Sequence, residues 1–159
     1  MKQYDIIASV CVYRPDELSA EDQQLVHAAM EATKTSYAPY SHFCVGAAVR
    51  LADGHVITGS NQENAAFPSG LCAERTALFA ANAQYPDTPV EALAIAAFTQ
   101  GHFLADPIPP CGACRQVILE VEDRYRQPIR ILLYGTEGIH VVDSVKALLP
   151  LYFVGASMK

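Results

Sequence analysis

Apolar side chains recur at helical spacing in three segments of the chain. In the first segment, Leu25, Ala29 and Ala32 lie on one face of a helix. Ser19 precedes this segment as a typical N-cap, with Asp22 as the acid three residues on. The other two segments are rich in strong helix formers. We therefore predict helices over residues 19–36, 72–83 and 111–125, and a short helix from residue 144.

Short apolar and β-branched runs between these helices are typical of buried strands. Asp53 and Gly54 separate the first two runs, and an Asp-Gly pair in this position is a strong hairpin signal. Apolar and small side chains also alternate over residues 6–11, which predicts a short N-terminal strand. The predicted strands of the main sheet cover residues 44–51, 56–59, 90–98, 129–134 and 139–142.

The order of these elements predicts the fold class. Helices that alternate with buried apolar strands favour a three-layer α/β/α sandwich over a mixed sheet, here of five strands. The chain contains no internal repeat and no linker-like stretch, so we expect a single domain over residues 19–159. Residues 1–18 are interpreted as a short, strand-like N-terminal extension.

The composition narrows the range of partners. The chain has 159 residues, 51% of them hydrophobic and 18% charged, and no run of 18 apolar residues that would predict a transmembrane helix. Eleven basic against 17 acidic residues give a formal net charge of −6. This is the wrong sign for a protein that follows nucleic-acid phosphates or an anionic membrane surface. We therefore expect a small-molecule partner, with no nucleic acid and no membrane.

The cysteine content indicates a reducing compartment. Five cysteines are an odd number, and we expect no export signal, because Asp5 precedes the apolar run of the first residues and Ser9 breaks that run. We expect the protein to be cytoplasmic. In such a compartment cysteines are more often metal ligands or catalytic groups than members of disulfides.

Three of the cysteines have the spacing of a metal site. Cys111 and Cys114 lie three residues apart in the first turn of a predicted helix, so both sulfurs point the same way. Cys72 opens another predicted helix, and helix N-termini favour thiolates. Three thiolates on one zinc ion leave the fourth tetrahedral position open, as in catalytic zinc sites. Glu74 follows closely enough to reach a water at that position.

Two other interpretations of these cysteines are open. Cys111 and Cys114 alone resemble a thioredoxin-type redox pair, although Cys72 in its Cys-Ala-Glu context argues against that. A closed structural zinc site would need a fourth ligand, which Cys11 or Cys44 offers. We expect these two cysteines to be small buried hydrophobic residues instead. The five histidines have no ligand spacing and are expected at the surface or in loops.

Four motifs together resemble the small homotetrameric cytidine deaminases. They occur in the order of that family, and the resemblance runs from about residue 19 to residue 153. Two departures are visible: Cys44 stands where Pro or a long side chain is usual, and residues 1–18 precede the usual start. The motifs are Phe-Cys-Val-Gly-Ala-Ala (43–48), Asn-Gln-Glu-Asn-Ala-Ala-Phe (61–67), Cys-Ala-Glu-Arg-Thr-Ala (72–77) and Pro-Cys-Gly-Ala-Cys-Arg-Gln-Val (110–117).

The resemblance implies a role for each matching residue. It implies that three cysteines bind one Zn²⁺ per subunit, that Glu74 moves protons, and that Arg75 donates hydrogen bonds to sulfur and offsets the charge of the site. The zinc ligands implied are Cys72, Cys111 and Cys114. The substrate-binding residues implied are Phe43 against the pyrimidine, Asn61 and Glu63 on the ribose hydroxyls, Ala65, Phe67, and Phe153 from a neighbouring subunit.

The function implied is hydrolytic deamination of cytidine and 2′-deoxycytidine to uridine and 2′-deoxyuridine, a reaction of pyrimidine salvage. The protein is then expected to be a homotetramer. A zinc-stabilised binding module without turnover is the alternative outside the enzymes. Editors of tRNA or single-stranded DNA and deaminases of aminonucleoside antibiotics are the alternatives among deaminases. The editors require a cationic path for the strand, which the acidic composition disfavours.

Overall fold

Residues 1–158, the part of the chain that the computed structural model describes, form seven strands, three α-helices and several 3-10 turns. The strands are β1 (Cys11–Tyr13), β2 (Cys44–Leu51), β3 (Val56–Ser60), β4 (Val90–Thr99), β5 (His102–Phe103), β6 (Arg130–Gly135) and β7 (Gly138–Val142). The helices are α1 (Ala20–Ala32), α2 (Ala73–Gln84) and α3 (Gly112–Tyr125). The 3-10 turns are η1 (Pro15–Glu17), η2 (Thr33–Thr35), η3 (Phe67–Ser69), η4 (Val145–Leu148) and η5 (Gly155–Met158).

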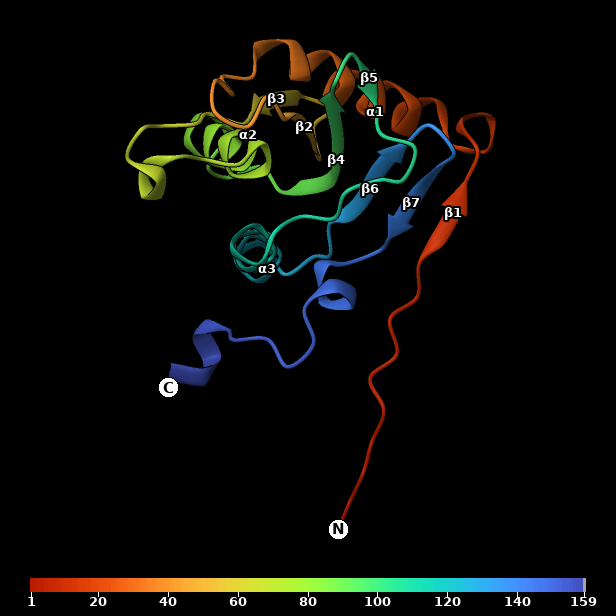
Figure 1. Ribbon diagram of the computed structural model, residues 1–159. Helices are drawn as coiled ribbons and strands as arrows, with labels where there is room; N and C mark the ends of the chain where they lie inside the picture. The colour runs from red at the N-terminus through yellow and green to blue at the C-terminus, as the bar shows by residue number, and fades with distance from the viewer. Residues whose placement is uncertain (159) are drawn as a thin grey trace.

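The strands form one mixed sheet in the order β1-β7-β6-β4-β2-β3, and β5 pairs with β4 (Figure 1). β4 and β6 are parallel, whereas the other neighbouring strands are antiparallel. α1 packs on one face of the sheet, and α2 and α3 pack on the other. The predicted three-layer α/β/α sandwich is therefore confirmed. None of the helices over residues 1–158 is long and apolar enough to span a bilayer.

The alternation of side chains along β4 builds both cores. Leu93 and Ile95 point into the core shared with α2 and α3. Ala92, Ala94 and Ala96 point to the other face and pack in the core below α1. Both faces of β4 are buried, as is typical of a central strand that carries a nearly continuous apolar run.

Asp22 connects α1 to the sheet. The Ser19 hydroxyl caps α1 by accepting a hydrogen bond from the Asp22 amide at 3.2 Å. The Asp22 carboxylate does not complete a reciprocal capping box. It instead accepts hydrogen bonds from Arg50 of β2 and Arg130 of β6, each at 3.1 Å. The buried carboxylate therefore fixes α1 across two strands that are distant in the sequence.

The prediction of five strands was wrong, because two short strands extend the sheet to seven. β1 begins at Cys11 and not near residue 6, because only residues 11–13 lie opposite β7, and residues 1–10 are exposed and have no strand partner. β5 forms between the predicted strand 90–98 and the predicted helix 111–125, where no strand was predicted, and Phe103 of β5 packs edge-on against Phe98 and Tyr134. Cys11 is exposed on the edge strand, so its expected burial was also wrong.

Two glycines have distinct local roles in the β2–β3 hairpin. Gly54 adopts a φ of 89° in the Asp-Gly turn, a conformation that side chains disfavour. Gly59 lies against the backbone of α2, where a methyl group would be only 2.8 Å from the Ala73 carbonyl oxygen and would also overlap the Ala77 amide. This close approach places the start of α2 beside β3.

We expect Gly59→Ala to lower the free energy of unfolding by about 1–3 kcal/mol, because the added methyl group must push α2 away from the sheet. Urea unfolding followed by far-ultraviolet circular dichroism measures the change. Gly155→Ala is the matched control, because no atom lies within 4 Å of its added methyl group. A Gly59→Ala protein as stable as the control variant would contradict this account of the packing.

Candidate metal centre and active site

Three cysteine sulfurs converge between the starts of α2 and α3. Cys72 is the N-cap of α2, Cys111 is the N-cap of α3, and Cys114 lies in the first turn of α3. The Sγ atom of Cys111 is 3.7 Å from that of Cys72 and 3.4 Å from that of Cys114. All three sulfurs lie within 4.8 Å of one another. Two segments 39 residues apart in sequence therefore meet at one point.

These sulfurs fit a tetrahedral zinc ion. Ligands at the usual Zn–S distance of about 2.3 Å would be about 3.8 Å apart, close to the sulfur separations found. Zinc binding requires deprotonated thiols, and in the metal-free cluster the hydrogen bond between Cys72 and Cys114 raises the pKa of Cys114 while it lowers that of Cys72. A hydrogen bond from the Cys114 thiol, reinforced by those from Arg75 and Cys111, lowers the pKa of Cys72 to about 5. Three thiolate donors are the ligand type that zinc accepts.

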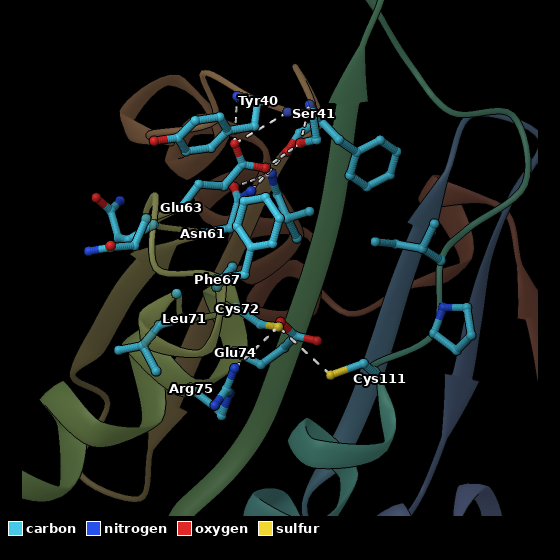
Figure 2. Close-up of a pocket in the computed structure, with 18 residues that line it drawn as sticks. Tyr40, Ser41, Asn61, Glu63, Phe67, Leu71, Cys72, Glu74, Arg75 and Cys111 are labelled. Carbon is cyan, nitrogen blue, oxygen red and sulfur yellow. Dashed lines mark hydrogen bonds between the residues drawn. The ribbon is translucent and has the colours of Figure 1, made fainter.

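Arg75 lies directly beside the sulfur cluster. Its Nη2 atom donates to Cys72 Sγ at 3.7 Å (Figure 2). Its Nε atom is buried and has no hydrogen-bond partner among the described residues. The guanidinium and the N-termini of α2 and α3 all bring positive charge toward the thiolates. This arrangement offsets the excess negative charge of a three-thiolate site.

Glu74 brings a carboxyl group to the same point. It lies in the first turn of α2, only 4% exposed, and its side chain lies close to Cys72 and Cys111 in Figure 2. Burial raises the pKa of the Glu74 carboxyl above its usual value, because a charged carboxylate is poorly solvated there. A buried carboxyl with a raised pKa is suited to both accepting and donating a proton.

A cavity of about 800 Å³ lies over the sulfurs and the carboxyl. Its volume is within the usual range for small-molecule sites. Its walls combine aromatic, aliphatic and polar side chains from the β2 start, the loop after β3, the start of α2 and the loop before α3. The lining residues are Tyr40, Ser41, Phe43, Val45, Asn61, Gln62, Glu63, Asn64, Phe67, Gly70, Leu71, Cys72, Ala73, Glu74, Arg75, Ile108, Pro109 and Cys111.

Glu63 forms the polar end of the cavity. Its carboxylate accepts hydrogen bonds from the amides of Tyr40 and Ser41, at 2.9 and 3.3 Å, and from the Ser41 hydroxyl (Figure 2). The hydrogen bond from the Ser41 hydroxyl is the largest cause that lowers the pKa of the Glu63 carboxyl, followed by that from the Tyr40 amide. The group is therefore a fixed, charged acceptor at the cavity wall.

The Asn61 side chain fixes the start of β2 beside Glu63. Its Oδ1 atom accepts from the Val45 amide at 2.8 Å, and its Nδ2 atom donates to the Phe43 carbonyl at 2.9 Å. The Asn61 backbone amide also donates to the Val45 carbonyl at 3.1 Å, so backbone and side chain together continue the pairing of β2 past the end of β3. This holds Phe43 at the cavity wall.

Comparison with known proteins agrees with this geometry. The family model described as the cytidine and deoxycytidylate deaminase zinc-binding region matches residues 19–126, a range that contains the three cysteines and Glu74. The chain belongs to this family.

Individual cytidine deaminases match this chain over nearly their whole length. A cytidine deaminase of Halalkalibacterium halodurans is 40% identical over 136 residues, which are 86% of this chain and 96% of the relative. The crystal structure of cytidine deaminase from Burkholderia pseudomallei matches with a TM-score of 0.70 and 42% identity, over 82% of this chain and 97% of the other. That of the Mycobacterium tuberculosis cytidine deaminase matches with a TM-score of 0.67 and 30% identity, over 86% and 99% of the two chains.

The structure brings most of the expected deaminase residues to one cavity, whereas Cys114, Ala65 and Phe153 do not line it. Phe43, Asn61, Glu63 and Phe67 line the cavity, as do Glu74 and Arg75 beside the sulfur cluster. Ala65 is exposed and does not line it. Phe153 lies on the C-terminal segment, 56% exposed, and it does not line the cavity of its own chain.

Sequence reasoning missed two residues of this deaminase site. Tyr40 and Ser41 line the cavity and donate to Glu63, although neither residue was assigned a role from the sequence alone. Their one visible signal is Pro39, which ends the helical pattern and leaves free backbone amides in the turn that follows.

We expect Cys111→Ala and Cys114→Ala to lose nearly all bound zinc, because two thiolates retain the ion poorly against competing chelators. Metal analysis of the purified deaminase variants measures the zinc content per chain. Cys44→Ala is the control and should keep the wild-type zinc content, because Cys44 is not part of the sulfur cluster. Loss of zinc from Cys44→Ala would instead indicate a closed site with four cysteines.

Proposed function

We propose that this protein catalyses the hydrolytic deamination of cytidine and 2′-deoxycytidine to uridine and 2′-deoxyuridine, with release of ammonia. The observation that carries this proposal is the convergence of three thiols and one buried carboxyl at the base of a cavity of about 800 Å³. Relatives that match nearly their whole length to this chain are named cytidine deaminases. Together these observations favour hydrolysis at the pyrimidine ring of a nucleoside.

Zinc is the cofactor that this proposal requires, at one ion per chain. Cys72, Cys111 and Cys114 would hold it, and the open position would face the cavity that Glu74 lines. The bound ion would act as a Lewis acid that makes water a stronger nucleophile at neutral pH. All five cysteines are free, and thiols stay reduced in the cytoplasm, so we place the protein there.

Glu74 moves the protons of the proposed reaction. Its carboxylate takes a proton from the attacking water and delivers that proton to N3 of the pyrimidine while the water oxygen adds to C4. The carboxylate then takes the proton of the new C4 hydroxyl and passes it to the amino group. The C4–N bond breaks, ammonia leaves, and a C4 carbonyl remains. One carboxyl group serves both transfers, because its raised pKa brings its two protonation states closer in energy near neutral pH.

The cavity wall supplies groups for the rest of the nucleoside. We assign the ribose hydroxyls to Glu63 and Asn61, and the face of the pyrimidine to Phe43, with Phe67 and the backbone near Ala65 closing the site. A carboxylate has about four lone-pair positions, so Glu63 keeps acceptor capacity beyond its three contacts with Tyr40 and Ser41. The Asn61 amide likewise keeps one donor hydrogen free.

We expect Glu74→Gln to lower kcat for cytidine at least about 100-fold, because the amide cannot carry the proton between water, N3 and the leaving amine. The loss of cytidine absorbance in the ultraviolet measures turnover, and metal analysis should show unchanged zinc. Glu137→Gln is the matched control, since Glu137 is exposed in the turn between β6 and β7. It should retain wild-type turnover.

Two results of the same assay would contradict the proposal. A wild-type protein that binds zinc but deaminates no cytidine would be a binding module without turnover. A protein that deaminates a cytosine-containing oligonucleotide in preference to free cytidine would be an editor of nucleic acid.

We also propose that the protein is a homotetramer with active sites shared between subunits. The support is the resemblance to the small homotetrameric deaminases and the exposure of Phe153, an aromatic residue that does not line the cavity over the sulfurs of its own chain. The Phe153 backbone carbonyl accepts from Gln116 of α3 at 2.9 Å, so the C-terminal segment is tied to α3 while Phe153 itself stays exposed. A nucleoside pocket closed by a neighbour would exclude water from the reacting atoms.

We expect a chain that ends after Leu149 to show a KM for cytidine about tenfold higher than wild type while it keeps its zinc. Loss of the Phe153 ring removes an aromatic contact with the substrate pocket of a neighbour, worth about 1.4 kcal/mol. Initial-rate kinetics and light scattering measure KM and the number of chains. A chain that ends after Gly155 is the control and should match wild type. An active monomer would contradict the shared site.

A further inference from the structure

Arg115 of α3 joins two segments that are far apart in the sequence. Its Nε atom donates to the Pro110 carbonyl at 2.8 Å, and its Nη1 atom donates to the Leu148 carbonyl. Pro110 directly precedes Cys111, whereas Leu148 ends the 3-10 turn η4 near the C-terminus. One guanidinium therefore bridges the loop before a zinc ligand and the segment that follows the last strand.

We infer that Arg115 is a positioning residue that fixes Cys111 in the geometry required for zinc, by tying the Pro110 carbonyl to the C-terminal segment. This inference rests on the zinc site of the proposed function. It assigns to Arg115 a role separate from that of Arg75, which contacts sulfur itself.

Cys111 needs this support because packing holds it less than the other two ligands. Cys114 is fully buried, and the Cys72 carbonyl accepts from both the amide and the hydroxyl of Thr76. Cys111 is exposed, and the two residues after it are exposed as well. A Cβ atom added at Gly112 would meet no described atom of another segment within 4 Å, so the residue after Cys111 has open space beside it. The Cys111 carbonyl accepts a hydrogen bond from the Arg115 amide at 2.9 Å, as the Cys72 carbonyl does from the Thr76 amide, so the Arg115 side chain adds a hold on the peptide that precedes Cys111.

The far end of the bridge is itself rigid. Glu122 lies two turns after Arg115 on the same helix and is buried. Its carboxylate accepts hydrogen bonds from the Val145 amide at 2.9 Å, the Ser144 hydroxyl at 2.8 Å and the Ile129 amide at 3.0 Å. These bonds hold η4 against α3 and so fix the Leu148 carbonyl. Arg115 thus connects Cys111 to a firmly held segment and not to a free end.

The planar guanidinium suits this bridge better than any other side chain. Its donors point in fixed, different directions, so it reaches two carbonyl groups at once. A lysine ammonium keeps the charge but has no such fork, and a glutamine amide is shorter and neutral. Residues that support metal ligands in this way typically change metal affinity about 10- to 100-fold when they are replaced.

The chain offers two controls on the same helix. Gln116, the next residue, donates to the Phe153 carbonyl and holds only the C-terminal segment beyond Leu148. Arg124 donates through Nη2 to the Pro86 carbonyl at 2.6 Å, which is an arginine–carbonyl contact remote from the sulfurs. Gln116→Ala and Arg124→Gln therefore remove comparable hydrogen bonds without changing the loop before Cys111.

The test measures the rate at which zinc passes from each zinc-loaded protein to an excess of a chelating dye. We expect Arg115→Gln to release zinc about 10- to 100-fold faster than wild type, with Arg115→Lys between the two. The cobalt-substituted Arg115→Gln protein should also show an altered visible spectrum, because the Cys111 thiolate is displaced. Gln116→Ala and Arg124→Gln should match wild type in both measurements.

Each remaining outcome has a definite meaning. If Arg115→Gln and Arg115→Lys release zinc at the wild-type rate and keep the wild-type cobalt spectrum, the inference is wrong even if they unfold at a lower temperature. If Arg115→Gln does not fold, the release rate and the cobalt spectrum of Arg115→Lys decide the question alone. If the wild-type protein itself retains no zinc, the proposed function fails and not only the role of Arg115.

Discussion

Three cysteine sulfurs lie within 4.8 Å of one another, and as thiolates they would repel one another strongly. A divalent zinc ion among them still leaves a net charge of −1, which weakens the ion as a Lewis acid. Arg75 and the N-termini of α2 and α3 bring positive charge to the cluster and oppose that effect. The need to balance this charge explains why both helices start at the sulfurs and why an arginine lies beside them.

The sheet makes this convergence possible. Gly59 in β3 allows α2 to approach the sheet closely, and α3 lies in the connection between the parallel strands β4 and β6. Both helices therefore pack on the same face, with their N-termini directed to one point. The two loops that lead into them also line the cavity, so the substrate and the reacting groups meet where the helices begin.

The sequence contained enough to predict the main elements and the pairing of Cys111 with Cys114, because both depend on local spacing. Cys72 lies 39 residues before Cys111, and its place in the cluster was predicted from its position at a helix start and its Cys-Ala-Glu motif. Cys111 and Cys114 share a helical turn, and the apolar periods of the main strands and helices are read directly from neighbouring residues. What could not be predicted depends on contacts between distant segments. β1 is a strand only where β7 lies beside it, and Ser41 meets Glu63 across 22 residues. Asp22 looked like a capping acid, but its carboxylate bonds to two arginines brought near by the fold.

The central claim is that cytidine is deaminated at a zinc ion held by three cysteines in each chain. Adding zinc stepwise to metal-free protein, with cytidine turnover and bound zinc measured in the same samples, tests this claim most directly. The account predicts that turnover rises in proportion to bound zinc and reaches its maximum at one zinc per chain. Turnover that is already complete without zinc, or that never appears at full zinc occupancy, would contradict it.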